Sequence, residues 1–167
     1  MRTRYLKLLL VALLISSTAH ADTTANFTLP SKVNISITES TIDPSHPPTC
    51  NVSGHKVPIT DNDAIPKTFV KRITATYMGR TYDLDSTCMY DAWGKRPLEV
   101  KGVIRYFGGS CCATDYCTFR GIFSDASESF VAEWVVGGGI ARRTVLTSSS
   151  DIVQLFMKNI DASNCYD

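Results

Sequence analysis

The chain has 167 residues, of which 44% are hydrophobic and 20% are charged, and its 17 basic and 16 acidic residues leave a formal net charge of +1. This apolar content argues against intrinsic disorder and suits one folded domain, and the near-neutral charge removes the electrostatic attraction on which nucleic-acid binding depends. We therefore expect a single globular domain with no nucleic-acid partner.

The first residues have the pattern of an export signal. Three basic residues at 1–7 precede an apolar run at 8–15, and the triplet at 19–21 is a small-x-small cleavage site. A spanning helix needs about 20 apolar residues, so an uncleaved membrane anchor is the weaker alternative. We expect a cleaved signal at 1–21 and an exported, periplasmic or secreted domain at 22–167 without a membrane segment, whose formal charge is then −2.

In the N-terminal half, alternating apolar and polar residues predict strands on both sides of a proline-rich segment. Strict alternation at 33–38 indicates a half-buried strand. Residues 41–66 contain five prolines and should hold little regular structure. A hairpin is then predicted at 70–77 and 81–84, with Gly79 supplying the positive φ of its turn.

In the C-terminal half, alternation and short turns predict four further strands, the last three in an antiparallel meander. They lie at 98–107, with Gly102 as a bulge, and at 118–123, 130–136 and 140–147. Apolar residues at helical spacing then predict a helix over 151–158, behind a serine run that can cap its first turn.

These elements predict an α+β domain stapled by disulfides. Its mainly antiparallel sheet would have about six or seven strands and would be covered on one face by the C-terminal helix. A β-sandwich with a peripheral helix is the nearest alternative. Trp134, which alternates with Ala132 and Val136, is expected in the core.

Six cysteines lie downstream of the signal, and exported thiols are expected to form disulfides. They are Cys50, Cys88, Cys111, Cys112, Cys117 and Cys165. Spacing favours a short Cys112–Cys117 bridge, with Cys111 bonded to Cys165 or Cys50, although many other pairings are open. A vicinal Cys111–Cys112 bridge and a metal site are weaker alternatives. We expect no metal and no cofactor.

Two segments could form a binding surface. A predicted loop at 108–117 holds three cysteines, and a loop fixed at its base loses little conformational entropy on binding. The segment at 88–94 places aromatic residues beside charges, and such residues often anchor interfaces. Core packing of Tyr90 and Trp93 is the alternative. The candidate binding residues are Thr114, Asp115, Tyr116, Tyr90, Asp91 and Trp93.

Catalytic signals are sparse. The sequence has no Gly-x-Ser-x-Gly, no His-Glu-x-x-His and no phosphate-binding glycine loop. We therefore expect a non-enzymatic binding protein that blocks a protein partner, such as a toxin or an envelope enzyme, through rigid disulfide-bound loops. One alternative is a small hydrolase of envelope glycans, whose carboxylate pair would come from Asp83, Asp85, Asp91, Asp115, Asp125 or Glu133. Another is a structural subunit of the envelope or of an adhesin.

In general plan the chain resembles periplasmic lysozyme inhibitors and the immunity proteins that guard bacteria against exported toxins. The stapled loop Cys112-x4-Cys117 is similar to one that inserts into the enzyme cleft in one inhibitor family, but residues 113–116 lack that family's histidine. The resemblance implies an inhibitory role for this loop. Glycosylation motifs at Asn26, Asn34 and Asn51 would matter only in a eukaryotic protein, and the signal is typical of a bacterial one.

Overall fold

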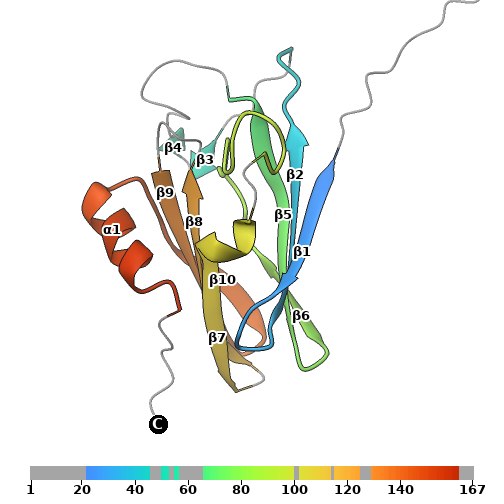
Figure 1. Ribbon diagram of the computed structural model, residues 1–167, viewed down its shortest axis with the longest axis vertical. Helices are drawn as coiled ribbons and strands as arrows, with labels where there is room; N and C mark the ends of the chain where they lie inside the picture. Colours follow the sequence, from blue (N-terminus) through green and yellow to red (C-terminus); the bar gives the residue numbers. More distant parts are fainter. Residues whose placement is uncertain are drawn as a thin grey trace, which may run out of the picture.

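The described residues form two four-stranded antiparallel sheets and one α-helix (Figure 1). A computed structural model describes residues 22–45, 50–52, 55–56, 66–99, 102–113, 115–124 and 129–161. The predicted signal, Thr114, Asp125 and Cys165 therefore lie outside the described residues. Within the described ranges, no helix is long and apolar enough to cross a membrane.

Each sheet pairs its neighbouring strands in an antiparallel register. The first, in the order β1-β2-β5-β6, contains β1 (Thr23–Thr28), β2 (Asn34–Thr41), β5 (Thr68–Tyr77) and β6 (Arg80–Leu84). The second, in the order β10-β9-β8-β7, contains β7 (Phe107–Ala113), β8 (Tyr116–Ser124), β9 (Ser129–Gly137) and β10 (Ile140–Thr147). The two-residue strands β3 (Asn51–Val52) and β4 (His55–Lys56) pair separately within the proline-rich segment.

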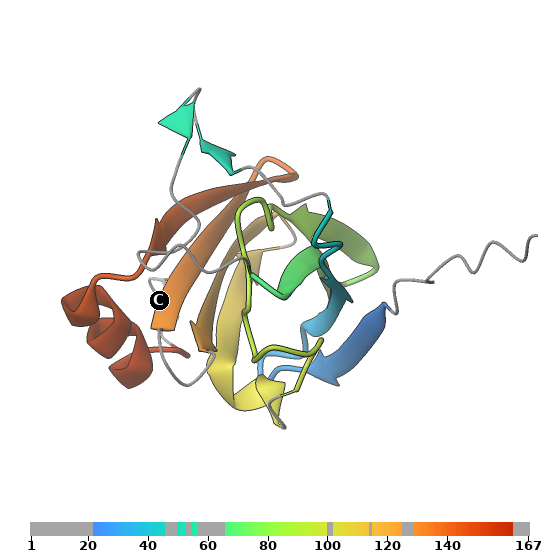
Figure 2. The same ribbon diagram turned by 90° about the horizontal axis from the view of Figure 1, so that it is seen from above.

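The two sheets face each other around a shared core, and α1 (Ser150–Lys158) lies outside the second sheet (Figure 2). Contacts join the sheets along both sides. On one side the rings of Phe27 and Phe107 pack edge to face, with centroids 6.1 Å apart. On the other side Trp134 Nε1 donates to the backbone oxygen of Asp85 over 2.9 Å. The arrangement is a β-sandwich of two separate sheets.

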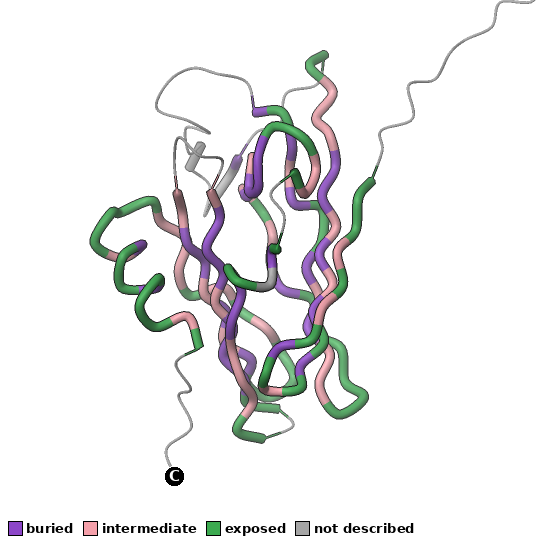
Figure 3. Tube along the Cα trace, in the orientation of Figure 1, coloured by how far each residue is buried: buried purple, intermediate pink, exposed green. Residues whose placement is uncertain are grey.

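Inward-facing residues recur at every second position, as the sequence predicts (Figure 3). Ile35 and Ile37 of β2 meet Ile73 and Ala75 of β5 in the core, and Trp134 of β9 is fully buried with them. The predicted strands at 33–38, 70–77, 81–84, 118–123, 130–136 and 140–147 correspond to β2, β5, β6, β8, β9 and β10. Alternation identified these strands because each has one face against the core.

The C-terminal helix is confirmed and packs on the outer face of the second sheet. Val153 and Phe156 are buried there against Ile122 of β8 and Val131 of β9. The expected side-chain cap is wrong, since Ser149 occupies the N-cap position without a side-chain capping bond. Apolar burial on the sheet therefore fixes this helix more than serine capping does.

The expectation of one sheet with six or seven strands is wrong, because the strands form two layers. Its coarser content holds, since the described chain is mainly antiparallel β with one C-terminal helix and disulfides. Strands β1 and β7 were missed. β1 is an edge strand with mostly exposed residues, and β7 begins with Phe107, Gly108 and Gly109. β1 has only two apolar residues, Ala25 and Phe27, and the glycines of β7 weaken its pattern.

The predicted strand at 98–107 is also wrong. Leu98 and Gly102 adopt positive φ angles of 51° and 77°, which extended strands do not allow. A 3-10 helix, η1 (Val103–Tyr106), follows and buries Val103. The described residues at 98–99 and 102–106 thus belong to an irregular crossover between the sheets. The predicted cysteine loop at 108–117 is instead β7, a tight turn and the start of β8.

Candidate functional site

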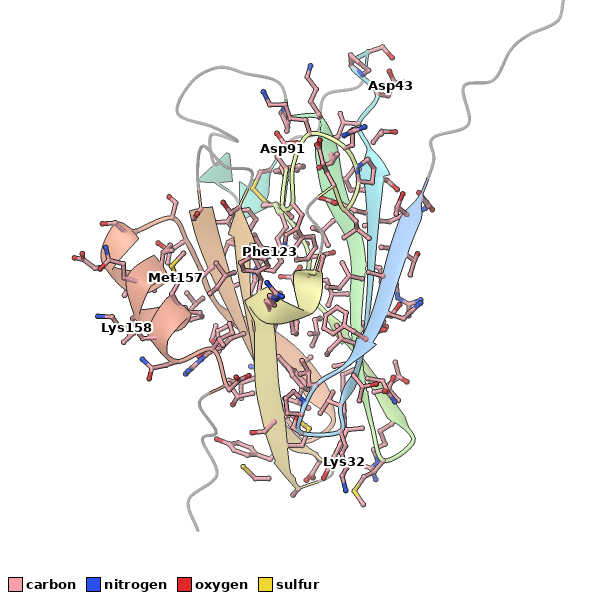
Figure 4. All side chains as sticks on the ribbon, viewed as in Figure 1. Lys32, Asp43, Asp91, Phe123, Met157 and Lys158 are labelled. Atoms are coloured by element: carbon pink, nitrogen blue, oxygen red, sulfur yellow. A yellow bond between two sulfur atoms is a disulfide. The ribbon has the colours of Figure 1, made fainter. Side chains whose placement is uncertain are left out.

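Four strand-to-strand turns gather at one end of the sandwich, which we call the hairpin end. They connect β1 to β2, β5 to β6, β7 to β8 and β9 to β10 (Figures 1 and 4). Lys32 marks this end in Figure 4, and Asp91 lies toward the opposite end. The Ser31 hydroxyl donates to the Gly109 carbonyl over 2.6 Å, so the β1–β2 turn is held against β7.

A disulfide joins β7 to β8 near this end. Cys111 and Cys117 are direct partners in the register, with Cα atoms 4.0 Å apart, and their sulfurs are bonded. The predicted Cys112–Cys117 bridge is therefore wrong, and so is the vicinal alternative. Successive side chains of a strand point to opposite faces, so Cys111 and not Cys112 shares the inner face with Cys117.

The remaining cysteines are oxidised where the structure describes them. Cys50 is bonded to Cys88, with Cα atoms 5.2 Å apart, and Cys112 is also disulfide-bonded. Cys165 lies outside the described residues. Two bridges of this kind indicate folding in an oxidising compartment. The correction at Cys112 also removes the residue pair on which the inhibitor-loop resemblance was based.

Large apolar side chains are exposed at the hairpin end. Tyr116 is 46% exposed, Ile140 58% and Met78 72%. Tyr116 and Ile140 both pair with Gly137 in the register, so they lie on the outer face with one strand between them. A Cβ added to Gly137 would meet nothing within 4 Å, so the surface between the two side chains is open.

Exposed basic side chains also lie at the hairpin end. Lys32, Arg80 and Arg142 are exposed on the β1–β2 turn, at the start of β6 and on β10. Among the described residues none forms an ion pair with them. Asp115 is the acidic residue in the β7–β8 turn and is also exposed. The hairpin end thus combines an aromatic ring, two aliphatic side chains and an excess of positive charge.

The other predicted binding segment, at 88–94, has a structural role. One Asp91 carboxylate oxygen accepts from the backbone N–H groups of Lys67 and Thr68, both over 2.8 Å. Trp93 is only 1% exposed, and its ring lies 4.9 Å from that of Phe123. Tyr90 is partly buried, and this burial raises the pKa of its hydroxyl. For Trp93 the core-packing alternative is the one observed.

The six candidates therefore do not form one surface. Asp115 and Tyr116 lie at the hairpin end, Tyr90, Asp91 and Trp93 lie at the other end, and Thr114 is outside the described residues (Figure 4). The sequence prediction also missed Met78 and Ile140, whose exposure follows from their place beside turns. Gly79 and Gly139, which adjoin them, were the available signal.

A buried carboxylate was missed as well. Glu39 is 0% exposed, and its two oxygens accept from the Leu98 N–H over 2.6 Å and from the Thr68 hydroxyl over 3.0 Å. Burial raises the pKa of Glu39 above its ordinary value, more than these hydrogen bonds lower it. Extending the alternation of Ile35 and Ile37 by two residues would have placed Glu39 on the inner face.

The acidic residues considered for a hydrolase are mostly engaged in contacts of their own. Ion pairs join Asp83 to Arg72 over 2.7 Å, Asp85 to Arg143 over 3.2 Å and Glu133 to Arg120 over 2.7 Å. Asp91 accepts backbone hydrogen bonds, and Asp125 lies outside the described residues. In the ranges that the structure describes, no group of three His, Cys, Asp or Glu side chains is arranged to hold a metal ion.

No protein-family model, no curated protein and no solved structure matches this chain. Its function is therefore argued from its own residues.

Proposed function

We propose that the protein is an exported, non-enzymatic binding protein that blocks a protein partner, a toxin or an envelope enzyme, with its hairpin end. The observation that carries this proposal is the exposed pair Tyr116 and Ile140 on a sheet in which the Cys111–Cys117 disulfide joins β7 to β8, the strand of Tyr116. Exposed aromatic residues on a rigid frame suit binding, because they contribute large contact areas and lose little conformational entropy.

The contacts of the acidic residues favour this proposal over a glycan hydrolase. A hydrolase needs two carboxyl groups that both reach the substrate. Glu39 and Asp91 lie close enough for the charge of Asp91 to raise the pKa of Glu39, but Glu39 is fully buried. Their oxygens accept hydrogen bonds that hold the loop after β6, which is a structural use of both groups.

The export part of the proposal rests on the basic and apolar pattern at 1–21 and on the disulfides. Both bridges between described cysteines are intramolecular. Edman sequencing of the protein recovered from the medium or the periplasm should begin at Asp22. A protein that keeps its N-terminal methionine and is found in the cytoplasm would contradict export.

Pull-down from a periplasmic extract tests the binding surface. The bait is the full-length exported protein, and the test variant carries Tyr116→Ala and Ile140→Ala. A matched control carries Leu155→Ala and Met157→Ala, because these side chains are 53% and 55% exposed on α1, away from the hairpin end. We expect the test variant to lose a partner that the wild type and the control both retain. Equal recovery of every bound protein by all three baits would refute the role of this surface.

A further inference from the structure

We infer that the partner presents an acidic surface, with an apolar centre, to the hairpin end. This inference rests on the proposed function and specifies the chemistry of the partner. Its basis is the combination of exposed apolar side chains with basic side chains that have no acidic partner among the described residues.

The described basic residues divide into those that form an ion pair and those that do not, and the unpaired ones include Lys67, Lys95, Arg105 and Lys158 in other parts of the chain. Lys71, Arg72, Arg96, Arg120 and Arg143 each contact a carboxylate within the protein. Lys32, Arg80 and Arg142 form no such pair in the described part of the chain, although they lie in three different turns or strand ends of the same surface. Uncompensated charge on a binding surface steers association with a surface of opposite sign.

The three basic residues lie on the same strands and turns as the exposed apolar residues or on neighbouring ones. Arg142 follows Ile140 by two residues on β10, so both side chains point to the outer face. Arg80 begins β6, which contacts β10, and directly follows the Met78–Gly79 turn. The bond from Ser31 to Gly109 brings the turn that carries Lys32 against β7. Exposed apolar and basic side chains thus share the hairpin end, and its basic residues would meet acidic residues beside an apolar contact.

A protein surface fits this arrangement better than an anionic membrane does. Membrane-binding basic segments usually cluster about four to eight Lys or Arg residues. The hairpin end has three described basic residues and also presents the acidic Asp115. Tyr, Met and Arg are the residue types enriched in protein interfaces, and Tyr116, Met78, Arg80 and Arg142 belong to them.

The first experiment identifies what touches the surface in cells. The photoreactive residue p-benzoylphenylalanine replaces Ile140 in the full chain, and a control protein carries it at Leu155 of α1. After irradiation, mass spectrometry identifies the crosslinked molecule and peptide. We expect Ile140 to crosslink to a protein at a segment rich in Asp and Glu, and Leu155 to leave that protein unlinked.

The second experiment uses the crosslinked protein in purified form and tests charge. The test variant carries Arg80→Gln and Arg142→Gln. The control carries Arg105→Gln and Lys158→Gln, which remove the same charge from exposed positions on η1 and α1. We expect the test variant to bind about tenfold more weakly, mainly through slower association, and high salt to have the same effect on the wild type. The control should bind like the wild type.

The two experiments distinguish a failure of this inference from a failure of the proposed function. A protein that crosslinks to Ile140 but binds equally well to the test variant and at high salt would overturn the acidic surface and leave the proposed function intact. Crosslinking of Ile140 to phospholipid, of a protein to Leu155 alone, or of no protein at either position would overturn the proposed function itself. Vesicles of phosphatidylglycerol serve as the membrane probe, and binding that needs Arg80 and Arg142 there would assign the charge to lipid instead.

Discussion

The Glu39 carboxylate accepts a 2.6 Å hydrogen bond from the backbone N–H of Leu98, 59 residues further along the chain. Leu98 adopts a positive φ of 51° at this point, a conformation that branched side chains rarely take. The buried carboxylate of β2 thus compensates a strained backbone position in the crossover between the two sheets. This contact gives the buried acidic side chain a hydrogen-bond partner within a mainly apolar core.

Substitution Glu39→Ala should lower the free energy of unfolding by roughly 2–4 kcal/mol, because it removes the acceptor of the Leu98 N–H and the shortest hydrogen bond of the Thr68 hydroxyl. Urea unfolding followed by tryptophan fluorescence measures the change. The control Asp83→Ala breaks an exposed ion pair with Arg72 and should cost no more than about 0.5 kcal/mol. Equal losses in the two variants would show that Glu39 has no special role.

The pH dependence of stability should also report Glu39. Burial raises its folded-state pKa above the ordinary value of 4.5, so the folded protein holds this proton more tightly than the unfolded chain does. Glu39 therefore contributes most to the stability of the folded state below pH 4.5, and this contribution falls as the pH rises through the folded-state pKa. The difference in unfolding free energy between wild type and Glu39→Gln, measured across this range, should shift in favour of the variant as the pH rises.

The contribution of Glu99 to stability changes with pH in the opposite direction to that of Glu39. The stability profile of the wild type alone therefore does not isolate Glu39, and the comparison with Glu39→Gln is needed. Its hydrogen bond with Arg96 lowers the pKa of Glu99, so its contribution is lost as the pH falls. Both proteins retain this pair, and its effect cancels in the difference. Parallel stability profiles for the wild type and Glu39→Gln would contradict the expected role of Glu39.

Removal of the longer disulfide should lower stability more, whereas removal of the shorter one should weaken partner binding more. The Cys50–Cys88 bridge spans 38 residues and the Cys111–Cys117 bridge spans 6. Loop-closure entropy then predicts losses of about 4 and about 2 kcal/mol when each pair is replaced by alanine. Partner binding should weaken more in the Cys111→Ala/Cys117→Ala variant, because that bridge fixes the hairpin end. Peptide mapping must show that Cys112 keeps its bond, and greater loss of binding in the Cys50→Ala/Cys88→Ala variant would contradict the assignment.

The two buried tryptophans should respond differently to the same substitution. Trp134 Nε1 donates to the Asp85 carbonyl, whereas Trp93 Nε1 is buried with no hydrogen-bond partner among the described residues. Each Trp→Phe change removes volume, but only Trp134→Phe also removes a hydrogen bond, and it leaves the Asp85 oxygen with the longer 3.3 Å bond from Arg143. We expect Trp134→Phe to be the more destabilising by about 1 kcal/mol. Thermal unfolding of both variants measures the difference, and a larger loss in Trp93→Phe would show that its packing dominates.

Period-two alternation revealed the strands that have one face in water and one in the core. It could not reveal β1, whose residues are largely exposed at a sheet edge, or β7, whose glycines weaken the pattern. The prediction at 98–107 failed for a different reason. Leu98 and Val103 pack against the core from a crossover, where the backbone turns at Leu98 and Gly102 instead of extending.

For the candidate site, sequence spacing suggested the importance of the segment around Asp115 and Tyr116 but assigned the wrong cysteine to its bridge. Cys112 and Cys117 are nearer in sequence, yet a bridge within a hairpin requires side chains on the same face, and only the register of β7 against β8 fixes that face. Likewise, residues 88–94 contain the same residue types as a recognition loop, and only packing shows that Trp93 is in the core.

The sequence by itself determined that this protein is mainly antiparallel β, ends in an amphipathic helix and contains cysteines that pair, because composition and periodicity are local properties of a chain. Tertiary structure decided that the strands form two facing sheets, that Glu39 supports Leu98 and that Tyr116 lies near Ile140. These relationships join residues far apart in sequence, and their geometry is set by the register and packing of whole strands, which local patterns do not contain.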